Sequence, residues 1–255
     1  YNFQGNVLVA YKGHLIYEGS FGYTNPRKRD PLEKDAIFQL ASVTKQFTAM
    51  AALIAIEKNL LSYQDTVTQY FPDFPYEGVT VHMLLNHTAG LPNYMWLLEH
   101  YWQGEDIPYN TDVMKLLAKH KLNPHFRPGT RFGYSNTGYV VLAAIIEKAS
   151  GMRFDKYMQQ EIFNPLNMED SFVQSAAYPS EQQKHLNGYK YWGRRYRKVP
   201  ATVNDGTVGD KGVYSTMEDL YKWDKALYDN TLVSEQTLKK AYEPLELKNG
   251  NHYPY

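Results

Sequence analysis

The apolar positions of the chain begin with a strand pattern. Residues 6–11 (NVLVAY) and 14–17 (HLIY) are short, largely apolar segments on either side of Lys12-Gly13. Two such segments joined by a two-residue turn that contains glycine are typical of a β-hairpin. The sequence therefore predicts an antiparallel pair of strands near its N-terminus.

A helical pattern follows between residues 42 and 59. Apolar residues recur there at helical spacing, among them Phe47, Met50 and Ile54, and they occupy most of the helix circumference. A helix that is apolar nearly all round is usually buried. We therefore expect a central buried helix with Ser42 at its start.

Capping residues help to place the other helices. Thr80 can cap a short helix, Gly151 lies where a C-terminal glycine is expected, and residues 215–218 (STME) form a capping-box pattern. With the spacing of apolar residues, these signals predict helices over residues 81–86, 111–121, 139–149, 153–163 and 215–227. Strand-like segments return near Tyr189, so the order of elements predicts an α/β domain with a helical insertion.

Charge and composition exclude several classes of protein. Lys plus Arg and Asp plus Glu are equal at 27 each, so no overall field attracts nucleic acid or an anionic membrane. The basic, aromatic segment 189–198 (YKYWGRRYRK) is therefore interpreted as a solvated hairpin that turns at Gly193, in preference to a nucleic-acid-binding strand. No apolar run approaches the length of a membrane span, and no signal peptide is visible. Because the chain opens at Tyr1 without Met, we expect a processed or trimmed N-terminus.

The residue types also limit the available chemistry. The sequence contains no cysteine, which removes disulfides, thiol catalysis and cysteine-ligated zinc. His82 and His87 are five positions apart, which is poor spacing for a metal site on a helix. We expect His87 to be buried or to cap a helix, since no partner for a catalytic role is specified. No metal and no cofactor are predicted.

The segment Ser42-Val43-Thr44-Lys45, at the head of the predicted buried helix, carries a possible nucleophile. A serine hydroxyl needs a nearby base to take its proton, and a residue three positions further along a helix lies on the same face. The helix start also favours negative charge beside Ser42. The alternative is that Ser42 caps the helix and Lys45 is a solvated first-turn residue, and the tetrapeptide alone favours that alternative.

A second candidate segment is Tyr134-Ser135-Asn136, which precedes the helix predicted over residues 139–149. A tyrosine can relay protons when a cation holds its phenolate form, and an asparagine amide can both donate and accept hydrogen bonds. The alternative is a tyrosine packed on the core and a helix cap at Ser135 or Asn136. Neither segment is specific by itself.

Together, Ser-x-x-Lys on a buried helix and Tyr-Ser-Asn before a second helix resemble the motifs of the serine β-lactamase and penicillin-binding family. The Tyr-x-Asn form is similar to the class C β-lactamase branch, with its related D-alanyl-D-alanine peptidases and esterases. Further similar segments, in the family's order, are residues 41–51 (ASVTKQFTAMA), 84–92 (LLNHTAGLP), 128–138 (PGTRFGYSNTG) and 209–223 (GDKGVYSTMEDLYKW).

The resemblance implies a fold, a reaction and a set of roles. The fold would be an antiparallel sheet flanked by helices, one domain over residues 1–255 with a mostly helical subdomain at approximately 65–200. Ser42 would be acylated, with its backbone N–H as an oxyanion donor, Lys45 and Tyr134 would share the work of the general base, and Asn136 would bind substrate. The substrate would be a β-lactam, a D-amino-acid peptide or an ester, and the protein would be periplasmic or otherwise in the cell envelope.

The sequence departs from the family at its C-terminal end. The family's third motif, Lys-Thr-Gly or His-x-Gly on a strand that lines the site, has no match after Gly209. Residues 248–250 (KNG) are interpreted as an ordinary turn, and we expect the closing strands and helix to be missing from a truncated chain. The absent motif leaves one alternative function open: a non-hydrolytic protein of penicillin-binding fold that binds peptides or cell-wall fragments.

Overall fold

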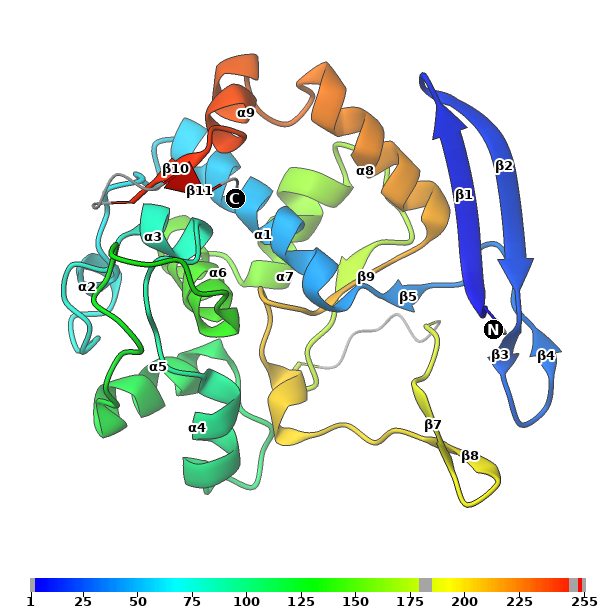
Figure 1. Ribbon diagram of the computed structural model, residues 1–255, viewed down its shortest axis with the longest axis horizontal. Coiled ribbons are helices and arrows are strands. Elements are labelled where there is room, and N and C mark those ends of the chain that lie inside the picture. The colour runs from blue at the N-terminus through cyan, green and yellow to red at the C-terminus, as the bar shows by residue number, and fades with distance from the viewer. Residues whose placement is uncertain (1–2, 179–184, 248–251, 254–255) are drawn as a thin grey trace.

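The computed structural model of the protein describes residues 3–178, 185–247 and 252–253. Its α-helices are α1 (Thr44–Glu57), α2 (Val67–Tyr70), α3 (Val81–Leu85), α4 (Tyr94–Tyr101), α5 (Asn110–His120), α6 (Asn136–Ser150), α7 (Phe154–Met158), α8 (Met217–Asp229) and α9 (Glu235–Ala241). Its strands are β1 (Gly5–Tyr11), β2 (His14–Phe21), β3 (Tyr23–Asn25), β4 (Asp30–Pro31), β5 (Phe38–Gln39), β6 (Phe172–Val173), β7 (Tyr189–Trp192), β8 (Arg195–Lys198), β9 (Val213–Ser215), β10 (Leu245–Glu246) and β11 (His252–Tyr253). Figure 1 shows α1 crossing the middle of the molecule, between a group of helices and the β1–β2 pair.

The predicted N-terminal hairpin is confirmed. β1 and β2 pair antiparallel from Gly5 opposite Phe21 to Tyr11 opposite His14. The connecting residues Lys12 and Gly13 have φ angles of 50° and 73°, the left-handed conformation of a tight hairpin turn. The hairpin contacts α8 through β1 at one side of the molecule (Figure 1).

The predicted buried central helix is also confirmed, with a correction at its start. Phe47 and Ala51 are fully buried, and α1 packs against α6. The α-helix begins at Thr44, two residues later than predicted, because a 3₁₀ turn (Ala41–Val43) precedes it. Ala41 has a φ of 46°, an uncommon conformation for a residue with a side chain, so the backbone just before Ser42 departs from helix geometry.

Local capping chemistry fixes the ends of several helices as the sequence predicts. The side chain of Thr80 accepts a hydrogen bond at the start of α3, and that of Ser135 accepts one from Gly138 at the start of α6. Gly151 ends α6 in the left-handed conformation. α8 is capped by Thr216, one residue after the Ser215 that heads the predicted capping box, so the helix begins later than predicted. The helix predicted over residues 153–163 is α7 followed by a π-helical turn (Gln159–Phe163).

A small sheet places the start of α1 beside a distant part of the chain. β5 and β6 both pair antiparallel with β9, giving the order β5-β9-β6. The Leu40 N–H, just before the 3₁₀ turn, donates a hydrogen bond to the Val213 carbonyl at 2.9 Å. The segment that leads into β9 therefore lies against Ser42 and Lys45.

The mixture of helices and antiparallel strands agrees with the predicted α/β class. A continuous hydrophobic cluster includes residues of both α1 and α6, so the subdomain boundaries near residues 65 and 200 stay a prediction. The predicted turn at residues 248–250 lies outside the described residues. Within the described ranges, every helix is too short or too polar to cross a lipid bilayer.

Candidate active site

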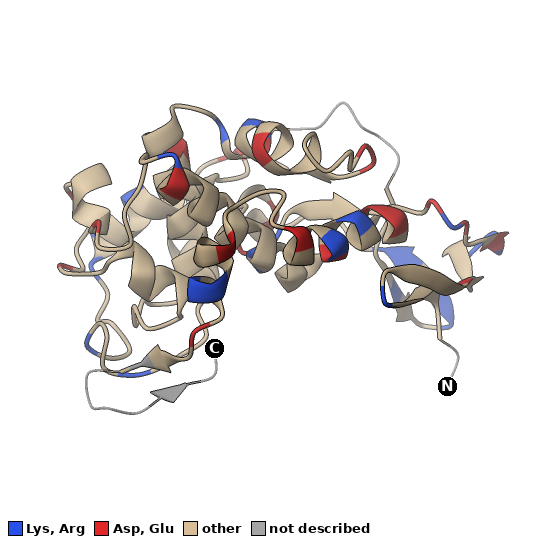
Figure 2. Ribbon diagram, turned by 90° about the horizontal axis from the view of Figure 1, so that it is seen from above, with Lys and Arg blue, Asp and Glu red and all other residues tan. Residues whose placement is uncertain are grey.

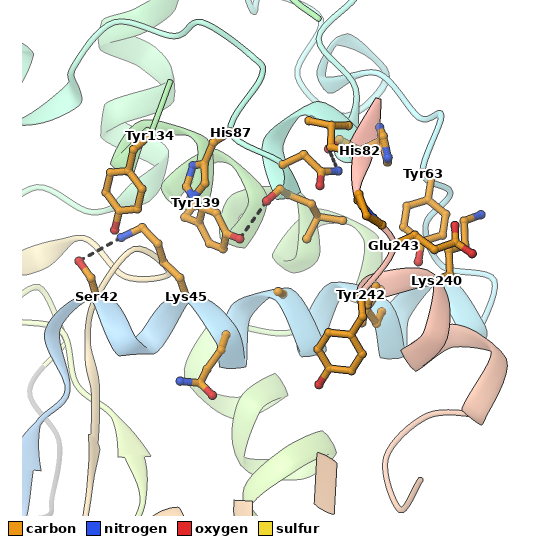
Figure 3. A pocket seen from close by; sticks show the side chains of 18 of the residues that line it. Ser42, Lys45, Tyr63, His82, His87, Tyr134, Tyr139, Lys240, Tyr242 and Glu243 are labelled. Atoms are coloured by element: carbon orange, nitrogen blue, oxygen red, sulfur yellow. Dashed lines mark hydrogen bonds between the residues drawn. The ribbon is translucent and has the colours of Figure 1, made fainter. Parts of the chain in front are cut away.

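A cavity of about 660 Å³ runs along one side of α1. It brings together Ser42, Lys45 and Tyr134, three of the four residues that the sequence singled out. Figure 3 shows these side chains at one end of the cavity, with Tyr63 and Lys240 at the other. The cavity is therefore elongated, with the candidate nucleophile near one end.

Ser42 and Lys45 lie side by side at one end of the cavity. Ser42 is exposed in the 3₁₀ turn, whereas Lys45 is buried in the first turn of α1, with 7% of its surface accessible. The Lys45 Nζ lies 3.3 Å from the Ser42 Oγ, within hydrogen-bonding distance. The alternative of a solvated Lys45 is therefore wrong, and Ser42 makes no capping hydrogen bond at the start of α1.

Two aromatic rings and a backbone carbonyl complete the surroundings of Lys45. Its Nζ donates a hydrogen bond of 2.8 Å to the Asp210 carbonyl. The same atom lies 5.0 Å from the ring centroid of Tyr134 and 5.7 Å from that of Tyr139. The pocket thus holds the Lys45 amine in one place from several directions.

The backbone of residues 209–213 is fastened to α1 by hydrogen bonds. Thr48 Oγ1 donates to the Gly209 carbonyl at 2.7 Å, and the Val213 N–H donates to Thr44 Oγ1 at 3.1 Å. Gly209 has a φ of 102°, and a Cβ there would lie 2.6 Å from the Tyr139 carbonyl oxygen. Only glycine fits this position without a shift of the backbone, so the close approach to α1 and α6 depends on it.

Behind Lys45 lies a buried polar cluster that the sequence did not predict. The Tyr94 hydroxyl donates to Asp210 Oδ2 at 2.9 Å and accepts hydrogen bonds from Thr207 Oγ1 and Lys211 Nζ, each at 3.0 Å. Burial raises the pKa of the Asp210 carboxyl, and the positive charge of Lys211 opposes that rise. Asp210 Oδ1 has no hydrogen-bond partner within the described residues. The only sequence signal for this cluster is the pair of glycines at 209 and 212, because the contacts join distant parts of the chain.

His87 supports the opposite wall of the cavity. It is buried, and its Nδ1 accepts a hydrogen bond of 3.1 Å from the Ser135 N–H. Burial, followed by the positive charge of Lys45, lowers the pKa of His87 to about 4, so the imidazole is neutral at pH 7. Its ring centroid lies 4.6 Å from that of Tyr134 and 5.0 Å from that of Tyr139. The expectation of a buried His87 is confirmed.

The Tyr134–Asn136 segment is more open than the α1 side. Tyr134 is 49% exposed, and its hydroxyl points toward Ser42 and Lys45 in Figure 3. Asn136 is the first residue of α6 and lines an adjoining pocket of about 280 Å³, which Tyr134 also lines. The buried Asn136 Oδ1 accepts no hydrogen bond from any described residue. The structure therefore places Asn136 next to the Ser42 cavity and not within its lining.

No group of three or more His, Asp or Glu side chains in the described ranges is arranged to hold a metal ion. The arrangement around Ser42 instead suits proton transfer from a hydroxyl to a neighbouring amine or phenol, which prepares the oxygen for attack on a carbonyl carbon.

Comparison with known proteins identifies the family. The family model described as beta-lactamase matches residues 4–250. A penicillin-binding protein of Bacillus subtilis (strain 168) is 38% identical over 265 residues, covering 100% of this chain and 59% of the relative. A D-aminopeptidase of Brucella anthropi is 28% identical over 255 residues, covering 98% of this chain and 47% of the relative. The chain thus spans between about half and three-fifths of the length of these two relatives.

A solved structure supports the same assignment. The crystal structure of a penicillin-binding protein from Bacillus halodurans is similar with a TM-score of 0.82 and 27% identity, over 99% of this chain and 78% of that one. The predicted α/β fold of β-lactamase and transpeptidase type is confirmed. The chain belongs to the β-lactamase family.

Proposed function

We propose that the protein is a serine hydrolase that forms an acyl-enzyme at Ser42. The observation that carries this proposal is the 3.3 Å separation of Ser42 Oγ from the buried Lys45 Nζ. Both residues line a cavity that a substrate can enter. A binding protein that never acylates has no need of a buried amine beside an exposed hydroxyl. The names of the relatives, a penicillin-binding protein and a D-aminopeptidase, support acyl transfer as the class of reaction.

In the proposed reaction, Ser42 Oγ attacks the carbonyl carbon of the substrate as its proton passes to Lys45 or Tyr134. The tetrahedral intermediate collapses to an ester on Ser42 as the carbon–nitrogen or carbon–oxygen bond breaks, and the proton held by Lys45 or Tyr134 passes to the leaving nitrogen or oxygen, which stays tethered to the acyl group in a β-lactam. Water then attacks the ester and releases the acid, which restores the serine. Lys45 touches Ser42 directly and Tyr134 points toward both, so the geometry supports a shared role in proton transfer.

The negative charge that develops on the carbonyl oxygen needs hydrogen-bond donors. The Ser42 N–H lies in the 3₁₀ turn just before α1, where the helix dipole favours an anion. We propose this N–H as one oxyanion donor. We propose that Asn136, whose amide oxygen lacks a partner among the described residues, contacts the substrate from the adjoining pocket.

The proposed substrates are β-lactams, D-amino-acid peptides or simple esters, all of which present a carbonyl to a serine nucleophile. The elongated cavity of about 660 Å³ accommodates a substrate that extends away from Ser42 along α1. We also propose a periplasmic or envelope location, because peptides of D-amino acids, one of the proposed substrate classes, are components of the cell wall.

A kinetic comparison of the protein with its Ser42→Ala variant tests the proposal. The substrate is an activated p-nitrophenyl ester, and the release of p-nitrophenol is followed under single-turnover and steady-state conditions. We expect Ser42→Ala to lower kcat by about a thousandfold or more, because it removes the nucleophile. Ser62→Ala is the matched control, since Ser62 is an exposed serine that does not line the cavity.

Equal turnover by the protein and by Ser42→Ala would overturn the acyl-enzyme proposal. If neither turns over any ester but both bind penicillin with the same affinity, the protein is a non-hydrolytic binder. That result would replace the proposed function with the alternative that the sequence left open.

A further inference from the structure

The segment 189–198, which the proposed function does not use, forms a hairpin that projects from the body of the molecule (Figure 1). We call β7, β8 and the turn between them the basic hairpin. The strands pair antiparallel, and the turn residues Gly193 and Arg194 have φ angles of 53° and 68°. These angles define a tight two-residue turn, so the predicted turn at Gly193 is confirmed and the tip of the hairpin is narrow.

The strand register sorts the side chains of the basic hairpin onto two faces. Lys190 is opposite Arg197, and Trp192 is opposite Arg195. Because side chains alternate along a strand, these four residues share one face. All four are exposed, Trp192 by 61%. One face of the hairpin therefore presents three cations and an indole ring to solvent.

The other face of the hairpin packs toward the turn between β3 and β4. Arg27 Nε donates a hydrogen bond of 2.7 Å to the Tyr196 carbonyl, and the Arg27 guanidinium lies 6.0 Å from the ring centroid of Tyr189. This contact brings Lys28 and Arg29 close to the hairpin. Figure 2 shows several Lys and Arg residues at the end of the molecule that carries the N-terminus, together with some Asp and Glu residues.

The cations of this surface form no ion pair within the described part of the chain, although Asp30 follows Arg29 directly in the sequence. None of its cations takes part in an ion pair within residues 3–178, 185–247 and 252–253, although such pairs form elsewhere on the surface. The cations are Arg27, Lys28, Arg29, Lys190, Arg194, Arg195, Arg197 and Lys198. A protein with equal numbers of acidic and basic residues thus concentrates unpaired positive charge at one place.

The tip of the basic hairpin adds exposed aromatic surface to the charge. Tyr191 and Trp192, the last two residues of β7 before the turn, lie on opposite faces and are 62% and 61% exposed. Tyrosine and tryptophan side chains favour the boundary between lipid headgroups and acyl chains, and cations behind them can contact lipid phosphates. A soluble phosphate polymer would match the charge but would leave both rings in water.

We propose that the basic hairpin docks the protein onto an anionic lipid bilayer. The rings of Tyr191 and Trp192 enter the interfacial region, and the cations of the hairpin and of the β3–β4 turn lie against lipid phosphates. The attachment is peripheral and reversible, because it combines electrostatic attraction with a small inserted apolar surface. This docking does not depend on the chemistry of Ser42, so the docking proposal and the proposed function are tested independently.

Co-sedimentation with vesicles tests the docking. The protein is mixed with vesicles of phosphatidylcholine, or of phosphatidylcholine and phosphatidylglycerol in equal parts, at low and high salt. We expect binding to the anionic vesicles alone, weakened by salt. The double variant Arg195→Gln/Arg197→Gln should lower the partition coefficient about 25-fold, since each cation near an anionic surface contributes about fivefold.

A matched control variant separates the effect of the hairpin from that of overall charge, and tryptophan fluorescence reports insertion of the tip. Lys115→Gln/Lys119→Gln removes the same charge from the exposed side of α5 and should leave binding within about twofold of the original. Insertion of the tip should blue-shift the tryptophan emission on vesicle binding, and Trp192→Phe should remove most of that shift.

Three results would overturn the docking proposal. Equal binding to neutral and anionic vesicles would exclude the electrostatic contact, and an equal loss in the α5 variant would show that overall charge, and not the hairpin, is responsible. Binding to inorganic polyphosphate without binding to either vesicle would assign the hairpin to a soluble polyanion instead. Circular dichroism of each variant separates these results from misfolding.

Discussion

The two walls of the cavity at Ser42 are held in different ways. On the α1 side, Thr44, Lys45 and Thr48 each make a hydrogen bond with the backbone of residues 209–213. On the opposite side, Tyr134 is 49% exposed, and its ring contacts the ring of His87 and the Lys45 Nζ.

The difference separates the parts of the site that must be fixed from those that can adapt. In the proposed reaction the proton acceptor has to keep a short distance to the nucleophile, and burial and hydrogen bonds on the α1 side would hold it there. A wall that meets the substrate can be more open, and a half-exposed Tyr134 is compatible with several substrate shapes. We therefore expect substitutions on the α1 side to have larger effects than substitutions on the Tyr134 side.

The largest expected effect comes from removing the amine at the fixed wall. Lys45→Met keeps the length of the side chain but has no group that can accept the Ser42 proton. Loss of a general base lowers the rate by about a hundredfold to ten-thousandfold, and we expect about a thousandfold in the acylation rate with the p-nitrophenyl ester. Lys58→Met, at the far end of α1, is the control and should acylate normally. A loss of less than tenfold in Lys45→Met would show that Lys45 is not the principal proton acceptor.

The second effect tests the close packing of residues 209–213 against α1 and α6. Gly209→Ala would place a Cβ 2.6 Å from the Tyr139 carbonyl at a φ of 102°, so both strain and a clash oppose it. We expect the free energy of unfolding in urea to fall by about 3 kcal/mol. Gly78→Ala has a φ of 73° but no neighbour within 4 Å of the added Cβ, so it should cost only about 1 kcal/mol. Equal costs would mean that the close approach to α6 does not matter.

The third effect concerns the support beneath the open wall. The pKa of His87 falls from 6.5 to about 4 on folding, so the unfolded chain binds the proton more tightly. The contribution of the neutral His87 to the free energy of unfolding is therefore fully present above pH 6.5 and is lost as the pH falls toward 4. Between pH 7 and pH 4.5 the loss from this group should be roughly 2 kcal/mol.

His87→Asn removes the titrating group while keeping an acceptor for the Ser135 N–H, and asparagine tolerates the φ of 56° at this position. Urea unfolding at the two pH values should show a smaller pH dependence in His87→Asn than in the protein or in the exposed control His100→Asn. The same pH dependence in all three would contradict the assignment of a buried neutral imidazole.

The smallest expected effect lies at the open wall. Tyr134→Phe keeps the ring contacts with His87 and Lys45 and removes only the hydroxyl. We expect the acylation rate to fall about tenfold, which is less than for Lys45→Met, since Lys45 is the residue in direct hydrogen-bonding contact with Ser42. Tyr63→Phe, at the far end of the cavity, is the control. If Tyr134→Phe lowers the rate as much as Lys45→Met does, the two walls contribute equally to proton transfer.

Features that depend on residues close together in the sequence are the ones that the sequence predicts. The predicted ends at Thr80 and Gly151 are confirmed, and Ser135 makes the cap that was considered as an alternative, because caps depend on hydrogen bonds and backbone angles within a few residues. The proximity of Ser42 and Lys45 is predictable for the same reason, since three positions on a helical turn bring side chains together.

Most of the features that the sequence does not predict depend on distant contacts. Lys45 and Asp210 are 165 positions apart, and nothing in the local pattern indicates that the Asp210 carbonyl accepts from Lys45. The same holds for Tyr94, whose hydroxyl reaches Asp210 across 116 positions. The 3₁₀ turn before Thr44 was missed because an apolar period does not distinguish it from a first helical turn. The role of Asn136 stays a prediction, since its side chain lies in the adjoining pocket.

The central claim is that Ser42 becomes acylated, and peptide mass mapping tests it most directly. The protein is incubated with a penicillin or with the p-nitrophenyl ester, quenched in acid and digested. The account predicts an added acyl mass on the peptide that contains Ser42, absent in Ser42→Ala and unchanged in Ser62→Ala. An adduct on any other peptide, or one that persists in Ser42→Ala, would contradict it.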